Sequence, residues 1–243
     1  MMRLDSLLVA RRLVDSRARA KAAIQAGGVT VDGMVVTNAS RTFDDDAVVS
    51  VTQAHDWVGR GALKLDHALT AWPVAVEGRV VLDVGASTGG FSEVCLKRGA
   101  ARVFAVDVGF GQLHDRIEAD PRVVSLERTD ARSLDRTLIP DAPALIVCDA
   151  SFIGLAKVLP VALELAEAGA DLIALVKPQF EGAGPSAVGK KGIVKDPEAH
   201  LAAVEGVSTW LASVGWVVQA TTDSPITGGD GNVEFLIWAK KSE

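Results

Sequence analysis

The sequence has little of what marks disulfide-rich, zinc-binding, secreted or membrane proteins. Its two cysteines, Cys95 and Cys148, stand in apolar or helical surroundings, which favours free buried thiols in a reducing compartment over a disulfide. Their spacing fits no zinc site, so no metal is expected. Residues 1–12 lack the unbroken apolar segment of a signal peptide. No charge-free apolar run reaches the roughly 18 residues of a membrane span, so a cytoplasmic protein with no membrane partner is expected.

Acidic residues outnumber basic ones in the chain as a whole but not at its start. The net charge of −6 by itself argues against a nucleic-acid-binding protein. Residues 1–41, however, hold seven Arg or Lys and three Asp, a net charge of +4 that leaves −10 for the remainder. This asymmetry indicates a basic module attached to an acidic one. The 243 residues, 49% of them hydrophobic, are enough for a large core domain and a small one.

Residues 1–52 have the pattern of a small α+β module. Leucines recur at helical spacing over residues 4–13, and a second helix is expected after residue 16. Two β-rich runs flank Asp32-Gly33, which predicts a hairpin, and a further strand is predicted at 47–51. Three segments resemble the alpha-L type RNA-binding domain: RLD at 3–5, SRARAKAAIQAG at 16–27 and VTVDG at 29–33.

This resemblance implies that the basic module binds RNA. Cations at the start of the second helix suit RNA phosphates, although such a cluster can also be an ordinary solvated helix face. The candidate RNA-binding residues of the module are Arg3, Arg17, Arg19 and Lys21.

Residues 60–243 predict a second domain, joined to the first by a linker at 53–59. Continuous Val/Ile/Leu runs indicate strands buried on both faces and hence a parallel sheet. The last two runs predict an antiparallel hairpin at the end of that sheet. Seven strands with the final one reversed make an α/β fold of the Rossmann-like class I methyltransferase type. The predicted strands span 79–85, 102–109, 122–128, 144–150, 171–177, 216–222 and 233–239.

A glycine-rich turn, DVGASTGGF at 83–91, follows the first of these strands and differs from the GxGxxG of dinucleotide sites. Glycines let the backbone approach a ligand closely, and ligands of such sheets bind at this edge. The carboxylate of Asp83 suits a cationic or amino-bearing ligand, such as S-adenosylmethionine, better than a pyrophosphate. The candidate cofactor residues of the turn are Asp83, Gly85, Ala86, Ser87, Thr88, Gly89, Gly90 and Phe91.

Two further acids end the next two strands. Asp107 stands 24 residues after Asp83, where an acid in nucleotide-binding folds holds ribose hydroxyls. Val108, beside it, is also a candidate cofactor-binding residue. Asp130 is placed to accept a hydrogen bond from an adenine amino group. An aspartate at a strand end can also serve only as a turn former.

Four polar residues lie where the predicted sheet presents one edge. Asp149 and Lys177 end two apolar strands, and the carboxyl ends of parallel strands share one rim. Glu234 begins the reversed last strand, so it lies on the same rim, and Lys64 is on the helix before the sheet. Buried charges are unfavourable unless paired, so the four residues form either a catalytic group or ordinary strand-end ion pairs.

Five motifs together resemble the TlyA family, historically called haemolysins: GRGALKL at 59–65, DVGASTGGF, CDASFI at 148–153, LVKPQFE at 175–181 and GNVEF at 231–235. Its members are ribosomal RNA 2′-O-methyltransferases with an alpha-L domain fused to an FtsJ-type domain. The resemblance implies that the FtsJ-type catalytic tetrad falls on Lys64, Asp149, Lys177 and Glu234.

The same resemblance implies S-adenosylmethionine as cofactor and a cytidine of ribosomal RNA, within the ribosomal subunits, as substrate. Large-subunit RNA is expected, because the segments before Arg3 and after Ala239 are short; some members also modify small-subunit RNA. A monomer and capreomycin-type drug susceptibility are expected as well.

The residue types of the tetrad suit this chemistry. A ribose 2′-hydroxyl is a poor nucleophile and must lose its proton as the methyl group transfers. A lysine accepts a proton only in its neutral form, which a dry pocket and a second lysine favour and carboxylates oppose. Lys177 is therefore assigned to orient and deprotonate the hydroxyl. Asp149, also near the sulfonium, and Glu234 position the lysines, and Lys64 steers the hydroxyl or the RNA backbone.

A long polar loop at 182–196 follows Lys177, and its Lys190 and Lys191 either hold RNA phosphates or are plain solvated charges. Arg60 is a further RNA-binding candidate. A nicotinamide dehydrogenase is disfavoured because GxGxxG is absent. An RNA-binding protein with an inactive methyltransferase domain is disfavoured by the intact tetrad, and a membrane-lytic haemolysin by the lack of an amphipathic or spanning segment.

Overall fold

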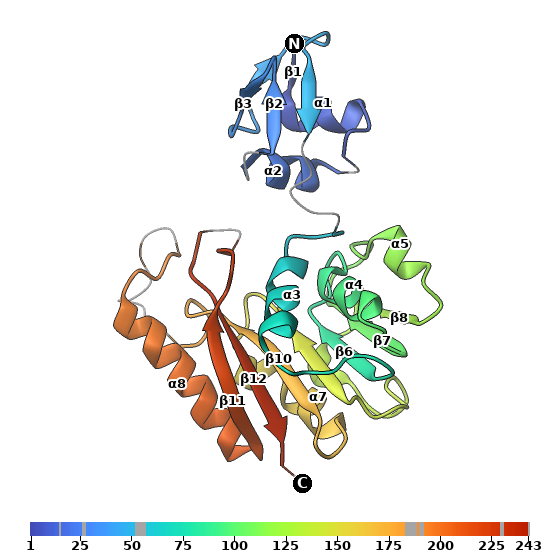
Figure 1. Ribbon diagram of the computed structural model, residues 1–243, viewed down its shortest axis with the longest axis vertical. Coiled ribbons are helices and arrows are strands. Elements are labelled where there is room, and N and C mark those ends of the chain that lie inside the picture. Colours follow the sequence, from blue (N-terminus) through green and yellow to red (C-terminus); the bar gives the residue numbers. More distant parts are fainter. Residues whose placement is uncertain are drawn as a thin grey trace. The chain divides into compact units, whose positions relative to one another are not determined.

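The structure, a computed structural model, divides into two compact units, Met1–Asp56 and Trp57–Glu243. It describes residues 1–14, 16–25, 28–51, 57–182, 189, 192–228 and 231–242. Each unit has a hydrophobic core of its own, and Figure 1 shows the helices and strands of each. The division falls inside the linker predicted at 53–59, of which residues 53–56 lie outside the described residues.

The smaller unit packs two helices against short strands. β2 lies between β3 and β5, and both pairs are antiparallel. The predicted hairpin is confirmed, and Asp32 and Gly33 have φ values of +49° and +80°, as the tight turn between its strands requires. The elements are β1 (Met2–Arg3), α1 (Leu4–Ala10), α2 (Arg17–Gln25), β2 (Val29–Val31), β3 (Met34–Val35), β4 (Thr42–Phe43) and β5 (Val49–Val51).

The first helix is shorter than the leucine spacing predicts. Arg12 adopts a φ of +56°, and the Leu13 N–H donates to Leu8 O at 2.9 Å, the hydrogen bond that closes a helix end of the Schellman type. Leu4 and Leu8 are buried, whereas Leu13 is 37% exposed. The prediction that Leu13 continues the helix is therefore wrong.

The larger unit is built on a seven-stranded sheet in the order β11-β12-β10-β9-β6-β7-β8. Among the described strands of this sheet, β12 is antiparallel to both of its neighbours, β10 and β11. The adjacent strands of the series β10-β9-β6-β7-β8 are parallel. This confirms the predicted α/β class and the reversed final strand. The strands are β6 (Val80–Val84), β7 (Arg102–Val106), β8 (Val123–Leu126), β9 (Leu145–Cys148), β10 (Asp171–Val176), β11 (Trp216–Asp223) and β12 (Phe235–Lys241).

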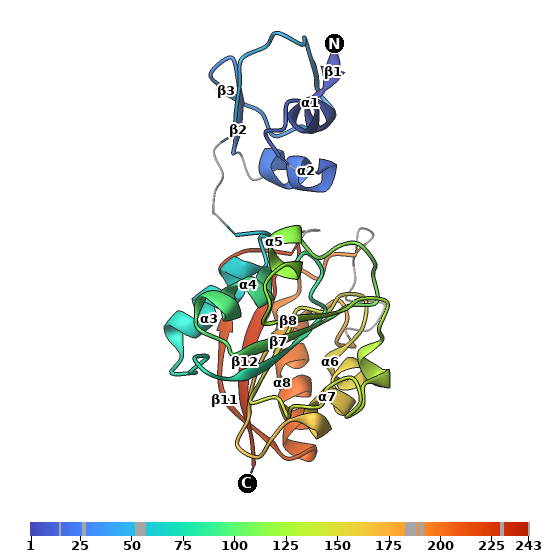
Figure 2. The ribbon, with the colours of Figure 1, turned by 90° about the vertical axis from the view of Figure 1, so that its right-hand side faces the viewer.

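Helices cover both faces of this sheet. Figures 1 and 2 show α3 and α4 on one face and α6, α7 and α8 on the other. The Asp196 carboxylate accepts from the Glu198 N–H at the start of α8, and Pro197 is its first residue, which confirms the predicted helix start. The helices are α3 (Ala62–Ala71), α4 (Gly90–Lys97), α5 (Asp115–Glu118), the 3-10 turn η1 (Ala131–Ser133), α6 (Leu155–Val158), α7 (Pro160–Leu165) and α8 (Pro197–Ser213).

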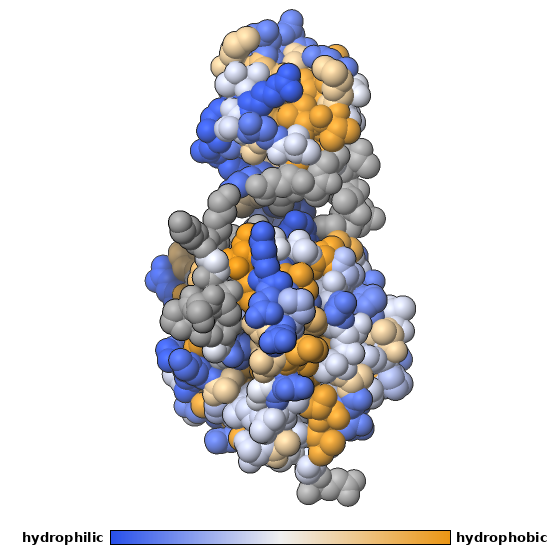
Figure 3. Space-filling model, turned by 90° about the vertical axis from the view of Figure 1, so that its left-hand side faces the viewer, coloured by the Kyte–Doolittle hydropathy of each residue, from blue (hydrophilic) through white to orange (hydrophobic). Residues whose placement is uncertain are grey.

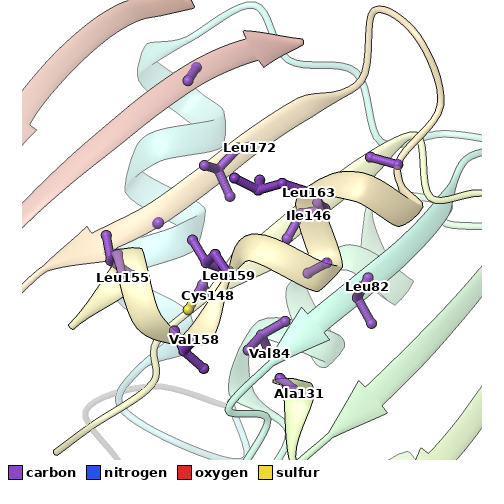
Figure 4. Close-up of a cluster of buried hydrophobic side chains, with 14 of the residues drawn as sticks. Leu82, Val84, Ala131, Ile146, Cys148, Leu155, Val158, Leu159, Leu163 and Leu172 are labelled. Carbon is purple, nitrogen blue, oxygen red and sulfur yellow. The ribbon is translucent and has the colours of Figure 1, made fainter. Parts of the chain in front are cut away.

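Each central strand sends alternate side chains into two cores. Figure 4 shows Leu82, Ile146 and Leu172, from β6, β9 and β10, in one buried cluster with side chains of α6 and α7 and with Leu159 between these two helices. The intervening residues of the same strands pack under α3 and α4. Burial on both faces explains the continuous Val/Ile/Leu runs of the sequence. Outside these cores, Figure 3 shows hydrophilic residues interspersed with hydrophobic ones on one face of the larger unit.

The two cysteines belong to different cores of the larger unit. Cys148 lies in the core beside α6 and α7, and Cys95 in the core beside α3 and α4. Both are free and fully buried, as predicted. Burial raises the pKa of the Cys148 thiol to about 12, so this group stays protonated and has little reactivity.

Candidate active site

The sheet topology brings the four predicted catalytic residues to one edge. Asp149 directly follows β9 and Lys177 directly follows β10, and these strands are adjacent and parallel. Glu234 immediately precedes β12, which pairs antiparallel with β10 so that Val176 faces Phe235. Lys64 projects from the first turn of α3. The predicted convergence of strand ends is therefore present, although Glu234 lies just before its strand rather than within it.

These four side chains form one chain of ion pairs. Lys64 Nζ lies 2.6 Å from Glu234 Oε2 and 3.3 Å from Asp149 Oδ2. Lys177 Nζ lies 2.7 Å from Asp149 Oδ1. Lys177 and Lys64 approach Asp149 Oδ1 and Glu234 Oε2, respectively, within ion-pair distance. The angles of these two contacts do not meet the geometry of a hydrogen bond. Asp149 thus holds one lysine with each oxygen, and the two positive charges balance the two negative ones.

Three members of the network are buried. Lys64, Lys177 and Glu234 are 6%, 4% and 3% exposed, and the Asp149 side chain is 20% exposed. Removing charges from water is costly, and their mutual attraction often does no more than offset that cost. An arrangement of this kind is a poor way to stabilise a fold, and buried charges at a cavity are typical of functional sites.

Lys177 has two further partners on the loop after β9. Its ammonium group donates to Asp149 O at 3.2 Å and to Ser151 Oγ at 2.9 Å. With the ion pair to the Asp149 carboxylate, three directions around the nitrogen are occupied. Sequence reasoning missed Ser151, although the motif CDASFI includes it, because nothing in the strand pattern shows that the loop turns back toward Lys177.

The glycine-rich turn has the geometry that only glycine permits. Gly85 has a φ of +82°, and a Cβ there would lie 2.8 Å from Ala150 Cα. Gly89 has a φ of +88°, and a Cβ there would lie 2.8 Å from a methyl group of Leu113. Such distances do not occur for real side chains, so the turn is held tightly between its neighbours.

Two cavities open beside this turn. One, of about 580 Å³, is lined by five predicted cofactor residues: Gly85, Ser87, Asp107, Val108 and Asp130. The other, of about 230 Å³, is lined by all four predicted catalytic residues and by Arg60, Gly85, Ala86, Ser87, Thr88, Gly90 and Phe91. The cavities share Gly85, Ser87, Asp149 and Ser151, so a group held in one can reach a group held in the other.

Asp107 and Asp130 both lie at the larger cavity with partners of their own. Asp107 Oδ2 accepts from the Ser87 N–H at 2.8 Å and Oδ1 from the Gly109 N–H at 2.7 Å; each oxygen keeps a second lone pair for a ligand. Asp130 caps η1 and pairs with Arg132 at 2.6 Å. Hydrogen bonds from Arg132 lower the pKa of Asp130 to about 2. Sequence reasoning missed Arg132, which also lines this cavity.

Asp83 lies elsewhere than predicted. Its side chain is fully buried, lines neither cavity, and accepts from Ser92 Oγ of α4 at 2.6 Å. Its other oxygen has no hydrogen-bond partner among the described residues, and burial raises the pKa of Asp83 to about 7. The contact with Ser92 thus directs this carboxylate toward α4 and into neither cavity.

The predicted RNA-binding residues fall in several places. In the smaller unit Arg3, Arg17 and Lys21 line a shallow cavity with the buried Asp5, which pairs with Arg3 at 2.9 Å and with Arg17 at 3.1 Å. The hydrogen bond from Arg3 holds the pKa of Asp5 well below its usual range. Sequence reasoning missed Asp5. Arg19 lies on α2 but not at this cavity, and Lys190 and Lys191 lie outside the described residues.

Two kinds of feature are missing from the part of the chain that the structure describes. No group of three or more His, Cys, Asp or Glu is arranged there to hold a metal ion. No helix among the same residues has the length and apolar character needed to cross a bilayer.

Comparison with known proteins gives the same division of the chain. The sequence signature of the FtsJ-like methyltransferases matches residues 57–241, and that of the S4 domain matches residues 2–49. The 16S/23S rRNA (cytidine-2'-O)-methyltransferase TlyA of Mycobacterium tuberculosis is 47% identical over 240 residues, which are 98% of this chain and 89% of that protein.

Solved structures of similar proteins give the same picture as the sequence comparisons. A hemolysin-named protein of Streptococcus thermophilus is 36% identical, with a TM-score of 0.80 over 100% of this chain and 89% of that one. Magnesium protoporphyrin IX methyltransferase of Synechocystis PCC 6803, solved with SAH bound, is 15% identical, with a TM-score of 0.53 over 75% of this chain and 84% of that one; this likeness shows the fold alone. The chain therefore belongs to the TlyA family of rRNA methyltransferases and carries an S4 domain ahead of an FtsJ-like methyltransferase domain.

Proposed function

We propose that this protein methylates the ribose 2′-oxygen of a cytidine in ribosomal RNA, with S-adenosylmethionine as the methyl donor. The observation that carries the proposal is the balanced network of Lys64, Asp149, Lys177 and Glu234, which lines a small cavity that shares a wall with the larger one. The relative from Mycobacterium tuberculosis is named for this activity.

The larger cavity fits the methyl donor by its size and by the residues around it. Its volume of about 580 Å³ is in the range of small-molecule sites. Gly85 lines this cavity with backbone atoms alone, because it has no Cβ. Asp107 offers a free lone pair on each carboxylate oxygen to hydroxyl groups, and Asp130, bonded to Arg132, lies at the same cavity. When bound there, S-adenosylmethionine would supply an electrophilic methyl group on a sulfonium.

The smaller cavity would hold the ribose. The 2′-oxygen would take the methyl group from the sulfonium, whose bond to that carbon would break, and Lys177, having first lost a proton to become a neutral amine, would accept the hydroxyl proton. Asp149 fixes Lys177 and Lys64 through its two oxygens, and Glu234 fixes Lys64. Holding the reacting atoms in line supplies a large part of the rate.

The S4 domain would bring the RNA. Arg3 and Arg17 are held in place by the buried Asp5 and, with Lys21, line one cavity. Cations fixed in this way suit the phosphate backbone, which gives most of the affinity in RNA recognition without specifying sequence.

Transfer of tritiated methyl groups from labelled S-adenosylmethionine to unmodified ribosomal subunits tests the proposal. We expect Lys177→Ala to lower the rate at least roughly 100-fold, since it removes the proton acceptor. Lys240→Ala is the matched control, because Lys240 is exposed and lies at the opposite end of β12. Normal methylation by Lys177→Ala refutes the assignment, and no methylation by the unaltered protein favours an RNA-binding protein with an inactive domain.

Mapping 2′-O-methylated nucleotides in both ribosomal subunits, from cells with and without this protein, tests the substrate. We expect a cytidine of the large-subunit RNA to lose its methyl group in the absence of the protein. A change confined to the small-subunit RNA would contradict this choice of subunit but leave the reaction type intact.

A further inference from the structure

A mostly buried carboxylate that the proposed reaction does not use joins the two loops of the catalytic lysine and aspartate. Glu181 stands four residues after Lys177 on the loop that follows β10. Its Oε1 atom accepts a hydrogen bond at 2.8 Å from the N–H of Leu155, where the loop that follows β9 ends. Burial raises the pKa of Glu181. Burying a carboxylate is unfavourable unless it is hydrogen-bonded, so the bond from Leu155 favours keeping this side chain between the two loops.

The two loops touch closely at this point. A Cβ on Gly154 would lie 2.9 Å from Phe180 O and 3.1 Å from Glu181 Oε2, so even a methyl group would force the loops apart. The rings of Phe152 and Phe180 lie with centroids 5.5 Å apart. Each loop therefore determines the path of the other.

The segment between Asp149 and Leu155 is also strained. Phe152 has a φ of +67°, a region that bulky residues rarely adopt. Such a conformation persists only when the surrounding structure holds it. Two tethers hold it here: Lys177 contacts Asp149 and Ser151 at one end, and Glu181 holds Leu155 at the other. The first of these contacts is made by Lys177, the proposed base, and changes when Lys177 gains or loses a proton. The hydrogen bond from Leu155 to Glu181 does not depend on that proton, so it holds the loop throughout the reaction.

We propose that Glu181 is a positioning residue whose carboxylate fixes the loop of Asp149 and Ser151 in place relative to Lys177. This inference rests on the proposed function. Glu181 does not touch the reacting atoms; it acts through the geometry of the lysine and its two partners. A misplacement of about 1 Å in such a site can lower the rate on the order of 100-fold.

Steady-state methyl transfer by three variants of the full chain tests this role. Glu181→Gln keeps an oxygen that accepts from Leu155, and we expect a kcat within about threefold of the unaltered protein. Glu181→Leu removes the acceptor, and we expect kcat to fall about 100-fold while the KM for RNA and the Kd for S-adenosylmethionine stay within about threefold. Glu205→Leu, at an exposed position on α8, is the matched control.

Three results would overturn the positioning role: a Glu181→Leu variant with unchanged kcat, a Glu181→Gln variant as slow as Glu181→Leu, or a loss expressed only in KM or in cofactor affinity. If Glu181→Leu does not fold, Gly154→Ala replaces it, and a normal kcat in that variant overturns the role equally. Lys177→Ala in the same assay separates the two proposals. An active Lys177→Ala refutes the proposed function, whereas an inactive one beside a fully active Glu181→Leu refutes only the role of Glu181.

Discussion

Replacing Lys64 by methionine tests how the network of Lys64, Asp149, Lys177 and Glu234 balances its charges. The substitution removes the cation 2.6 Å from Glu234, whose side chain is 4% exposed, and leaves Asp149 with Lys177 at 2.7 Å. Breaking a buried ion pair by removing one partner costs about 3–5 kcal/mol, because the other charge remains buried without compensation. With a urea dependence of about 2 kcal/mol per molar, a loss of about 4 kcal/mol lowers the unfolding midpoint by about 2 M.

The double substitution Lys64→Met with Glu234→Leu should behave differently. It replaces a buried pair by apolar side chains of similar size, which is often neutral or stabilising, so we expect the midpoint to return to within about 0.5 M of the unaltered protein. Methyl transfer should be lost in both variants. Stability recovered without activity would separate the structural effect of the pair from its catalytic effect.

Tryptophan fluorescence is the appropriate assay for these midpoints. All five tryptophans lie between Trp57 and Trp238, within the larger unit, so their signal follows the unfolding of the methyltransferase domain alone. Lys240→Met, at an exposed position on β12, serves as control. A midpoint of Lys64→Met close to that of the control, or a double variant as unstable as the two single changes combined, would refute this account of the network.

Two other predictions follow from buried carboxylates. Burial raises the pKa of Asp83 to about 7, above its unfolded value of about 3.9, so the folded state holds a proton that the unfolded chain has released. The free energy of unfolding should therefore fall as pH rises between about 4 and 7, and Asp83→Asn should remove this part of the pH dependence. Identical pH profiles of the two proteins in urea unfolding would contradict the prediction. Arg17, held by Asp5, should contact one phosphate, so Arg17→Ala should reduce the slope of log affinity against log salt by about one. Filter binding at several salt concentrations measures that slope, with the exposed Arg136→Ala as control; an unchanged slope would count against the contact.

The sequence predicts the convergence of the four candidate residues because strand ends in a parallel sheet have a fixed location. Asp149 and Lys177 each end an apolar run, and the direction of the last strand brings Glu234 to the same edge. Asp83 stands at a strand end as well, but the pattern of a strand buried on both faces does not show on which side a polar residue lies. In the structure the pleat directs it toward Ser92 and away from the cavities.

The contacts made by loops could not be predicted in the same way. Ser151 and Glu181 act on residues of neighbouring loops, and Arg132 turns back on Asp130. No period in the sequence encodes these paths, because loop geometry depends on the elements that the loop connects and not on a repeating pattern. Asp5 was missed for a related reason: an acid among arginines shows no sign of being buried until the helices are packed.

The place of β12 in the sheet makes the ion-pair network depend on a pairing between strands that are distant in the sequence. β12 follows β11 along the chain but lies between β10 and β11 in space. Strands β6 to β10 and the glycine turn can assemble from residues 80–176, whereas Glu234 arrives only when β12 inserts beside β10. Because distant pairings form slowly, the pairing that brings Glu234 to this edge of the sheet should be among the last to form. The ion-pair network would thus be complete only when the whole sheet is.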